Sequence, residues 1–204
     1  MSEYTQGMDL RLVETDLPLR LRFETPLSEE ALFRFCEGND SVWIEREPNG
    51  ELSVGLLAGA RASRVLVAIL CQLWDWAEKD GRGQVLSNAG FLLPDGSMRG
   101  AQLAWVSNER WQALTEEQRH GFAPLCPEFV VHVLGFAAEL AEARARMERW
   151  IANGAQFALL FDPGLQQVTT FRSAMQPEIQ DEWKSGPGGE VFRGAHRVLS
   201  GGWR

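Results

Sequence analysis

Apolar and polar positions follow two different periods along this chain, and the two periods meet within residues 127–154. Residues 129–134 form an apolar run that is rich in valine and bounded by proline and glycine. A run of this length and composition predicts a strand that is buried on both faces. One polar side chain, His132, lies inside it. Apolar positions at helical spacing follow over residues 140–151, and Asn153-Gly154 predicts the end of that helix.

The same two periods predict the remaining elements. Apolar positions at i, i+3 and i+4 predict a long helix from Ala62 to Ala77, with Gly81 after its end. Ser28, followed by two glutamates, predicts the N-cap of an earlier helix that reaches Glu37. Asn49-Gly50 predicts a hairpin turn. Strands are expected at residues 17–23, 42–46, 52–57, 84–87, 91–93, 98–106, 156–161, 167–172 and 191–199, and a helical segment at residues 108–119.

Strands flanked by helices in this order predict an α/β layer fold built on a mixed central β-sheet. The chain has 204 residues, of which 45% are hydrophobic, and this is sufficient for one domain with a substantial core. We expect that domain to span residues 27–204, after an N-terminal arm at residues 1–26.

Composition narrows the classes of function. The net charge is −8 and no basic stripe is present, so no nucleic-acid partner is expected. No apolar run reaches about eighteen residues, so no membrane span is expected. The N-terminus lacks a basic-then-apolar leader, which predicts a cytoplasmic protein. Three cysteines without a CxxC pair argue against a disulfide framework or a zinc knuckle.

The aromatic content is unusual, with eight tryptophans and one tyrosine. Three tryptophans lie on apolar stripes and are expected in the core: Trp74, Trp105 and Trp150. Three others have no such stripe and are candidates for an exposed contact with a protein or peptide: Trp76, Trp111 and Trp183.

Two central segments resemble the Uma-type putative restriction endonucleases, a family within the PD-(D/E)XK nuclease superfamily. They are LPDGSMRGAQLAWVSNERWQALTEEQRHGFAPLCPEFVVHVLG at Leu93–Gly135 and RMERWIANGAQFALLFDP at Arg146–Pro163. The segment WIEREPNGELSVG at Trp43–Gly55 adds to the resemblance, and the closing GEVFRGAHRVLSGGW adds to it more weakly. The resemblance implies a restriction-endonuclease-like (PD-(D/E)XK) core with a mixed central sheet flanked by helices.

The resemblance also implies three catalytic positions, and this chain departs from the family at all three. The family's aspartate, glutamate and lysine correspond to Gln102, His132 and Arg146. Only Glu45, in the first hairpin, keeps an acid where the family often has one. An amide oxygen and an imidazole nitrogen are poor ligands for Mg²⁺, and a guanidinium cannot act as a base. We therefore expect no catalytic residues, no metal site and no cofactor.

Each of these residues also has an ordinary structural interpretation. Because buried polar groups normally find a partner, His132 is expected to form a neutral hydrogen-bonded pair with Gln102. Arg146 is expected to pair with Glu142, one helical turn earlier. Glu45 is expected to be a surface acid on its strand.

The leading hypothesis is a pseudoenzyme: a non-catalytic protein with the nuclease fold that binds a peptide or protein partner and assists or regulates another enzyme or complex. Strand addition at a sheet edge is one simple binding mode. The alternative is a metal-dependent DNA endonuclease with a divergent active site, in which Glu45 and His132, with or without Gln102, bind a transition metal. Its cofactor would be Mn²⁺ or, as in the family, Mg²⁺. A third hypothesis is a DNA-binding regulator that does not cleave. A homodimer is implied by the resemblance alone.

Overall fold

A nine-stranded mixed sheet organises the protein in a computed structural model, which describes residues 19–55, 58–135 and 140–181. The strand order is β1-β3-β2-β5-β6-β7-β8-β9, and β4 pairs with β5 beside this path. Among these strands only β6 and β7 are parallel, and α5 is the crossover between them. The predicted α/β fold with a mixed sheet flanked by helices is confirmed.

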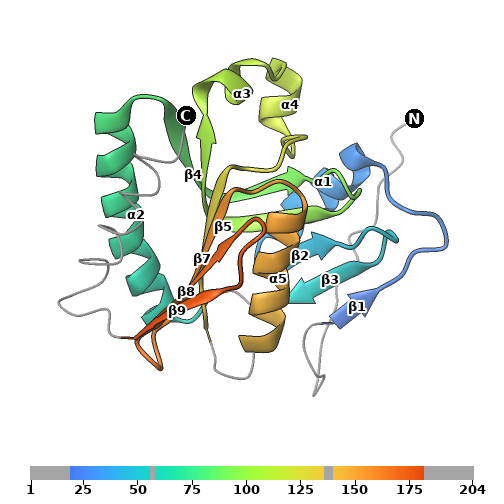
Figure 1. Cartoon of the computed structure of the whole chain (residues 1–204). Helices are drawn as coiled ribbons and strands as arrows, with labels where there is room; N and C mark the ends of the chain where they lie inside the picture. The colour runs from blue at the N-terminus through green and yellow to red at the C-terminus, as the bar shows by residue number, and fades with distance from the viewer. Residues whose placement is uncertain (1–18, 56–57, 136–139, 182–204) are drawn as a thin grey trace.

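Figure 1 shows the elements in space, and their bounds agree closely with the hydrophobic pattern. The strands are β1 (Leu19–Leu21), β2 (Trp43–Arg46), β3 (Leu52–Gly55), β4 (Gly83–Leu92), β5 (Met98–Ser107), β6 (Phe129–Val133), β7 (Phe157–Asp162), β8 (Gln167–Arg172) and β9 (Glu178–Asp181). The helices are α1 (Glu29–Glu37), α2 (Ala60–Asp80), α3 (Asn108–Gln112), α4 (Glu116–His120) and α5 (Leu140–Ala152).

Helices α2 and α5 cover opposite faces of the sheet. Buried side chains of α2, among them Leu73, pack with Val131 of β6 in one core cluster. Buried side chains of α5, among them Trp150, pack with Val130 of β6 in a second cluster. This is the alternation predicted for a strand buried on both faces, and it directs position 132 of β6 toward α5.

A smaller third cluster packs α1 against the β2–β3 hairpin and the start of β5. The Ser28 side chain accepts a hydrogen bond from the amide of Ala31, so the predicted N-cap is confirmed. Gly50 in the hairpin turn has a φ of 85°, a conformation that glycine adopts without strain. This cluster lies where β2 pairs with β5, through Arg46 opposite Met98.

Several predictions about individual elements were wrong. Trp74 is 51% exposed and Trp76 is 7% exposed, the reverse of the prediction. The buried stripe of α2 includes Leu73 and the residues three and four positions after it, Trp76 and Ala77, whereas Trp74 lies outside this stripe. Residues 83–92 form one continuous strand rather than two, because β4 pairs with β5 on both sides of Asn88. Strand β9 was not predicted.

Part of the predicted N-terminal arm joins the sheet, since β1 pairs with β3. The domain boundary between residues 26 and 27 stays a prediction. The expected strand at residues 191–199 and Trp183 lie outside the described residues. Across the described ranges, no helix is long and apolar enough to cross a membrane.

Candidate functional site

A buried carboxylate, Glu45 of β2, is the centre of a charged site between the hairpin and α5. Glu45 is 2% exposed, so the expectation of a surface acid was wrong. Its Oε1 accepts hydrogen bonds from the Trp43 indole at 3.3 Å and from the Gly100 amide at 3.2 Å. Gly100 is required for this approach, because a Cβ there would come within 2.4 Å of the Trp43 ring.

Arg99 of β5 neutralises two carboxylates at once. Its guanidinium lies 3.2 Å from Glu45 and makes two contacts with Glu47, at 2.6 and 3.1 Å. Burial raises the pKa of Glu47, but the ion pairs with Arg99 and Arg149 outweigh it and hold that pKa below its usual value. The Arg99 side chain is 3% exposed, and its buried Nε has no hydrogen-bond acceptor among the described residues.

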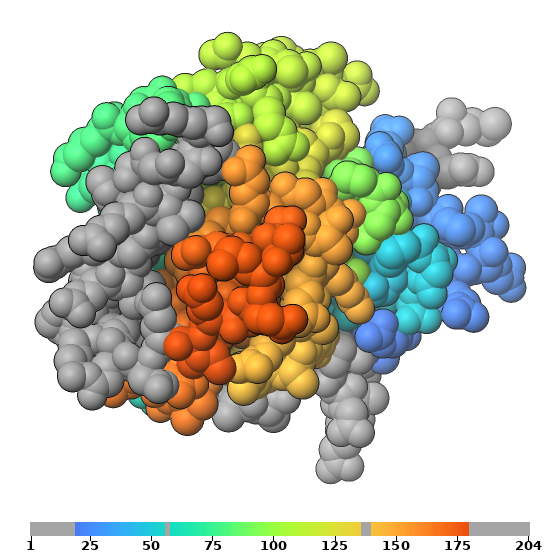
Figure 2. All heavy atoms as spheres, in the orientation of Figure 1, coloured from blue at the N-terminus to red at the C-terminus, as the bar shows by residue number. Residues whose placement is uncertain are grey.

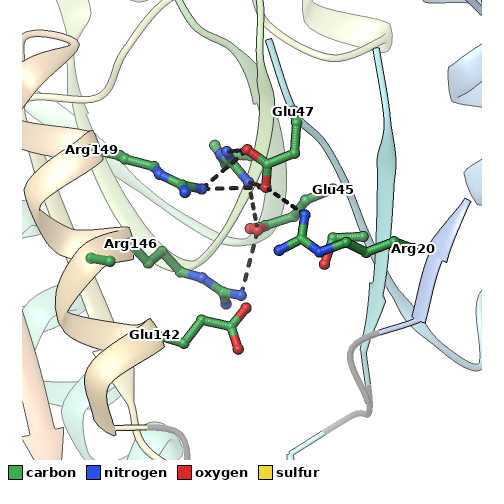
Figure 3. Close-up of a pocket in the computed structure, with 9 residues that line it drawn as sticks. Arg20, Glu45, Glu47, Glu142, Arg146 and Arg149 are labelled. Atoms are coloured by element: carbon green, nitrogen blue, oxygen red, sulfur yellow. Dashed lines mark hydrogen bonds and ion pairs between the residues drawn. The ribbon is translucent and has the colours of Figure 1, made fainter. Parts of the chain in front are cut away.

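Helix α5 brings two further arginines to the same carboxylates. Arg146 lies 3.4 Å from Glu45, and Arg149 lies 3.1 Å from Glu47. Figure 3 shows both side chains reaching from α5 toward β2, with Arg20 of β1 on the far side. Arg146 pairs with Glu45 rather than with Glu142, the predicted partner, although Glu142 lines the same cavity.

The cavity among these side chains has a volume of about 70 Å³. Four guanidinium groups and three carboxylates line it. The charged residues are Arg20, Glu45, Glu47, Arg99, Glu142, Arg146 and Arg149. A fourth carboxylate, Glu51, lies 3.1 Å from Arg20 at the edge of the cavity. In Figure 2, α5 lies on the face toward the viewer, with the β2–β3 hairpin beside it.

Gln102 connects two strands where their backbone pairing ends. The ladder between β5 and β6 runs from Trp105 opposite Phe129 to Leu103 opposite Val131. Beyond it, the Gln102 side chain accepts a hydrogen bond from the Val133 amide at 2.7 Å and donates one to the Val133 carbonyl at 3.4 Å. The predicted Gln102–His132 hydrogen bond was therefore wrong: the amide bonds the neighbouring backbone.

His132 lies on the face of β6 that is turned toward α5. Burial lowers the pKa of its imidazole, and the nearby positive charge of Arg146 lowers it further, to about 3. The imidazole is therefore neutral at pH 7. Arg146 thus forms an ion pair with Glu45 and acts on His132 through its charge. The residues that line the cavity around Glu45 include Arg146 but neither His132 nor Gln102.

Sequence reasoning missed Glu47, Arg99 and Arg149, which complete the site. Glu45 of β2 and Glu47, one residue beyond the end of that strand, are two positions apart, so period two would have placed them on the same side of the hairpin. Likewise Arg146 and Arg149 are three positions apart, the spacing of neighbours on a helix. No comparable signal in the sequence connects Arg99 with either pair, because the pairing of β5 with β2 is a long-range contact.

Three comparisons with known proteins bear on this geometry. Residues 29–194 match the model of the family Uma2, described as a putative restriction endonuclease. The fold is similar to that of a crystal structure described as a putative nuclease belonging to DUF820 from Anabaena variabilis ATCC 29413. The TM-score is 0.59 at 14% sequence identity, over 70% of this chain and 78% of the other. No curated protein matches the sequence.

These matches overturn the leading hypothesis from the sequence. The leading hypothesis, a nuclease-fold protein whose role is to bind a peptide or protein partner and assist another enzyme, was wrong, because the matched family is described as putative restriction endonucleases. That hypothesis had treated three changed side chains as loss of the family's function. Whether the changes at Gln102, His132 and Arg146 abolish catalysis stays a prediction, as does the homodimer.

Proposed function

Because the chain belongs to the Uma2 family of putative restriction endonucleases, we propose that it is a DNA endonuclease with a divergent active site. The observation that carries the proposal is the position of Arg146 on α5, where the helix faces β2 and packs on β6. There Arg146 interacts with both the buried acid Glu45 and the neutral imidazole of His132. The reaction class is hydrolysis of a DNA phosphodiester.

The family pattern implies a Mg²⁺ ion at this site, and the donor groups present do not fit one. Mg²⁺ prefers several charged oxygen ligands. Glu45 is already neutralised by Arg99 and Arg146, and the Gln102 oxygen accepts from the Val133 amide. Within the ranges that the structure covers, no group of three His, Cys, Asp or Glu side chains could hold a metal ion. The residues of this site therefore act without a metal in the proposed reaction.

Arg146 supplies positive charge where a nuclease needs it. Its side chain is 20% exposed, and its guanidinium remains charged at any physiological pH. When water attacks the phosphorus, negative charge grows on the phosphate oxygens. A fixed guanidinium stabilises that charge more strongly in a partly buried site than it would in water. Arg146 is therefore the residue that stabilises the transition state.

His132 supplies a proton acceptor. As its pKa is about 3, the imidazole is unprotonated at pH 7 and can take the proton of the attacking water while the P–O bond to the leaving oxygen breaks. The leaving oxygen is then protonated by solvent. So low a pKa makes His132 a weak base, which predicts slow turnover. Gln102 acts through the strand as a positioning residue, since its two bonds to Val133 fix the backbone beside His132.

Nicking of supercoiled plasmid tests the proposal, with parallel reactions in EDTA, Mg²⁺ and Mn²⁺. We expect open-circular product from the wild-type protein and none from His132→Ala. Arg64→Gln is the matched control, because Arg64 is exposed on α2, which covers the opposite face of the sheet. The proposal fails if no product forms under any of the three conditions, or if His132→Ala cleaves at the wild-type rate.

A further inference from the structure

The two arginines of α5 are each a second partner for a carboxylate that Arg99 already neutralises. Arg99 contacts both Glu45 and Glu47. Arg146 adds to the first pair and Arg149 adds to the second. If either α5 arginine turned to another anion, its carboxylate would keep an ion pair with Arg99. Because no buried carboxylate would be left unpaired, the cost of releasing these two guanidinium groups is small.

The exposure of the side chains also separates Arg99 from the other arginines of the site. The Arg99 side chain is 3% exposed, whereas Arg146 and Arg149 are 20% and 48% exposed. Arg20, at the other side of the cavity, is 51% exposed; it lies 3.1 Å from Glu51 and 3.9 Å from Glu47. The buried arginine thus stabilises the interior of the site, whereas the three outer arginines line the cavity and, as Figure 3 shows, reach toward Glu45 and Glu47 from its two sides.

An unpartnered donor lies in the same site. The buried Nε of Arg99 has no acceptor among the described residues, and Arg99 lines the cavity. A buried donor without an acceptor is costly, and either a water or the oxygen of an anion would satisfy it. A cation cannot satisfy an N–H donor, whereas a phosphate oxygen can. The four guanidinium groups around this cavity and the Arg99 donor suit an anion better than a metal ion.

We infer that this cavity is a phosphate-binding subsite, in which Arg146, Arg149 and Arg20 hold a phosphate group without a divalent cation. Arginine suits this ligand, because its planar fork donates two parallel hydrogen bonds to phosphate oxygens. The inference rests on the proposed function in one respect: it takes the phosphate to belong to a DNA backbone. Free inorganic phosphate has the same chemistry and is distinguished by experiment.

Fluorescence anisotropy of a short labelled DNA duplex in EDTA tests the inference. We expect salt-sensitive binding by the wild-type protein that Mg²⁺ does not strengthen. Arg149→Gln should weaken binding about tenfold and lower the salt slope by about one, because one phosphate contact is lost. Arg64→Gln, on the opposite face, should bind as the wild type does. Arg149 is half exposed, so its variant is expected to fold, which circular dichroism checks.

The outcomes separate this inference from the proposed function. Duplex binding that requires Mg²⁺ or Mn²⁺ would overturn the phosphate subsite and leave the nuclease proposal standing. Metal-free binding without nicking would support the subsite and contradict the nuclease. Titration calorimetry with inorganic phosphate tests the other source of the ligand. Binding of free phosphate without any duplex binding would support the subsite but contradict its assignment to DNA. Equal binding by wild type and Arg149→Gln would overturn the subsite.

Discussion

The guanidinium of Arg146 lies 3.4 Å from the buried carboxylate of Glu45, and this pair joins α5 to β2 across the site. In the family that the chain resembles, the position of Arg146 holds a lysine. A longer, planar and permanently charged side chain reaches the acid here. The acid that would otherwise attract a cation is therefore neutralised by the protein itself.

Glu45→Gln should lower the free energy of unfolding by about 3 kcal/mol. The substitution preserves shape but removes the negative charge between Arg99 and Arg146, and removing one partner of a buried pair leaves an uncompensated charge. Urea unfolding measures the change. Glu148→Gln, on the exposed side of α5, is the control and should change stability little. Equal stability of the two variants would show that the Glu45 charge does not stabilise the fold.

The stability of the protein should fall as pH decreases from about 6.5 toward 3. The His132 pKa is about 3 in the folded protein and near 6.5 in the unfolded chain, so only the unfolded chain binds a proton in this window. The stability is fully present above pH 6.5, and its slope from this one group is at most about 1.4 kcal/mol per pH unit. Arg146 is the charged group that contributes to the shift.

Urea unfolding of wild type and His132→Gln between about pH 5 and 6.5 measures this slope. The lower limit avoids Glu47, whose pKa lies below its ordinary value of 4.5 and adds its own slope only in more acidic solution. We expect a flatter dependence in the variant. The same slope in both proteins would mean that the imidazole is not held neutral by the fold.

Gly100→Ala should destabilise the protein and displace Glu45. A Cβ at this position would come within 2.4 Å of the Trp43 ring, and both residues donate hydrogen bonds to the Glu45 carboxylate. Either the backbone or the Trp43 ring must shift, which lowers the free energy of unfolding by about 1 to 3 kcal/mol. Thermal unfolding and tryptophan fluorescence follow the change. Gly59→Ala is the control, because a Cβ there meets nothing within 4 Å. Equal melting temperatures for Gly100→Ala and Gly59→Ala would contradict the close packing of Gly100 against the Trp43 ring.

The fold could be predicted from the sequence because its signals are local. Residues 129–134 and the helix after them show clear periods, and Ser28 and Asn49-Gly50 mark a cap and a turn. The burial of Trp74 and the burial of Trp76 were predicted the wrong way round, because the two residues lie only two positions apart near the edge of the apolar stripe of α2. Periodicity is least decisive at such an edge.

The site was predictable only in part. The resemblance located Gln102, His132, Arg146 and Glu45, but the burial and pairing of Glu45 depend on long-range contacts. Arg99 reaches Glu45 and Glu47 because the hairpin packs beside β5, and no local pattern encodes that contact. For the same reason, the Gln102 amide could not be assigned to the Val133 backbone in advance.

Restoring the family's residues should restore metal binding. The triple variant Gln102→Asp, His132→Glu and Arg146→Lys supplies two new carboxylates and replaces the guanidinium at Glu45, which suits a hard divalent ion. Isothermal titration with Mn²⁺ should show binding to the variant and none to the wild type, with circular dichroism to check folding. If the wild-type protein bound Mn²⁺ as tightly as the variant does, the claim that its donor groups do not suit a metal ion would be wrong.

The rate of DNA nicking by Arg146→Gln and Arg146→Lys tests the central claim most directly. If the Arg146 guanidinium stabilises the charge that grows on the phosphate, Arg146→Gln should nick plasmid about a hundredfold more slowly than the wild type. Arg146→Lys should retain an intermediate rate, because it keeps the charge but loses the planar fork. Nicking by Arg146→Gln at the wild-type rate would contradict the claim.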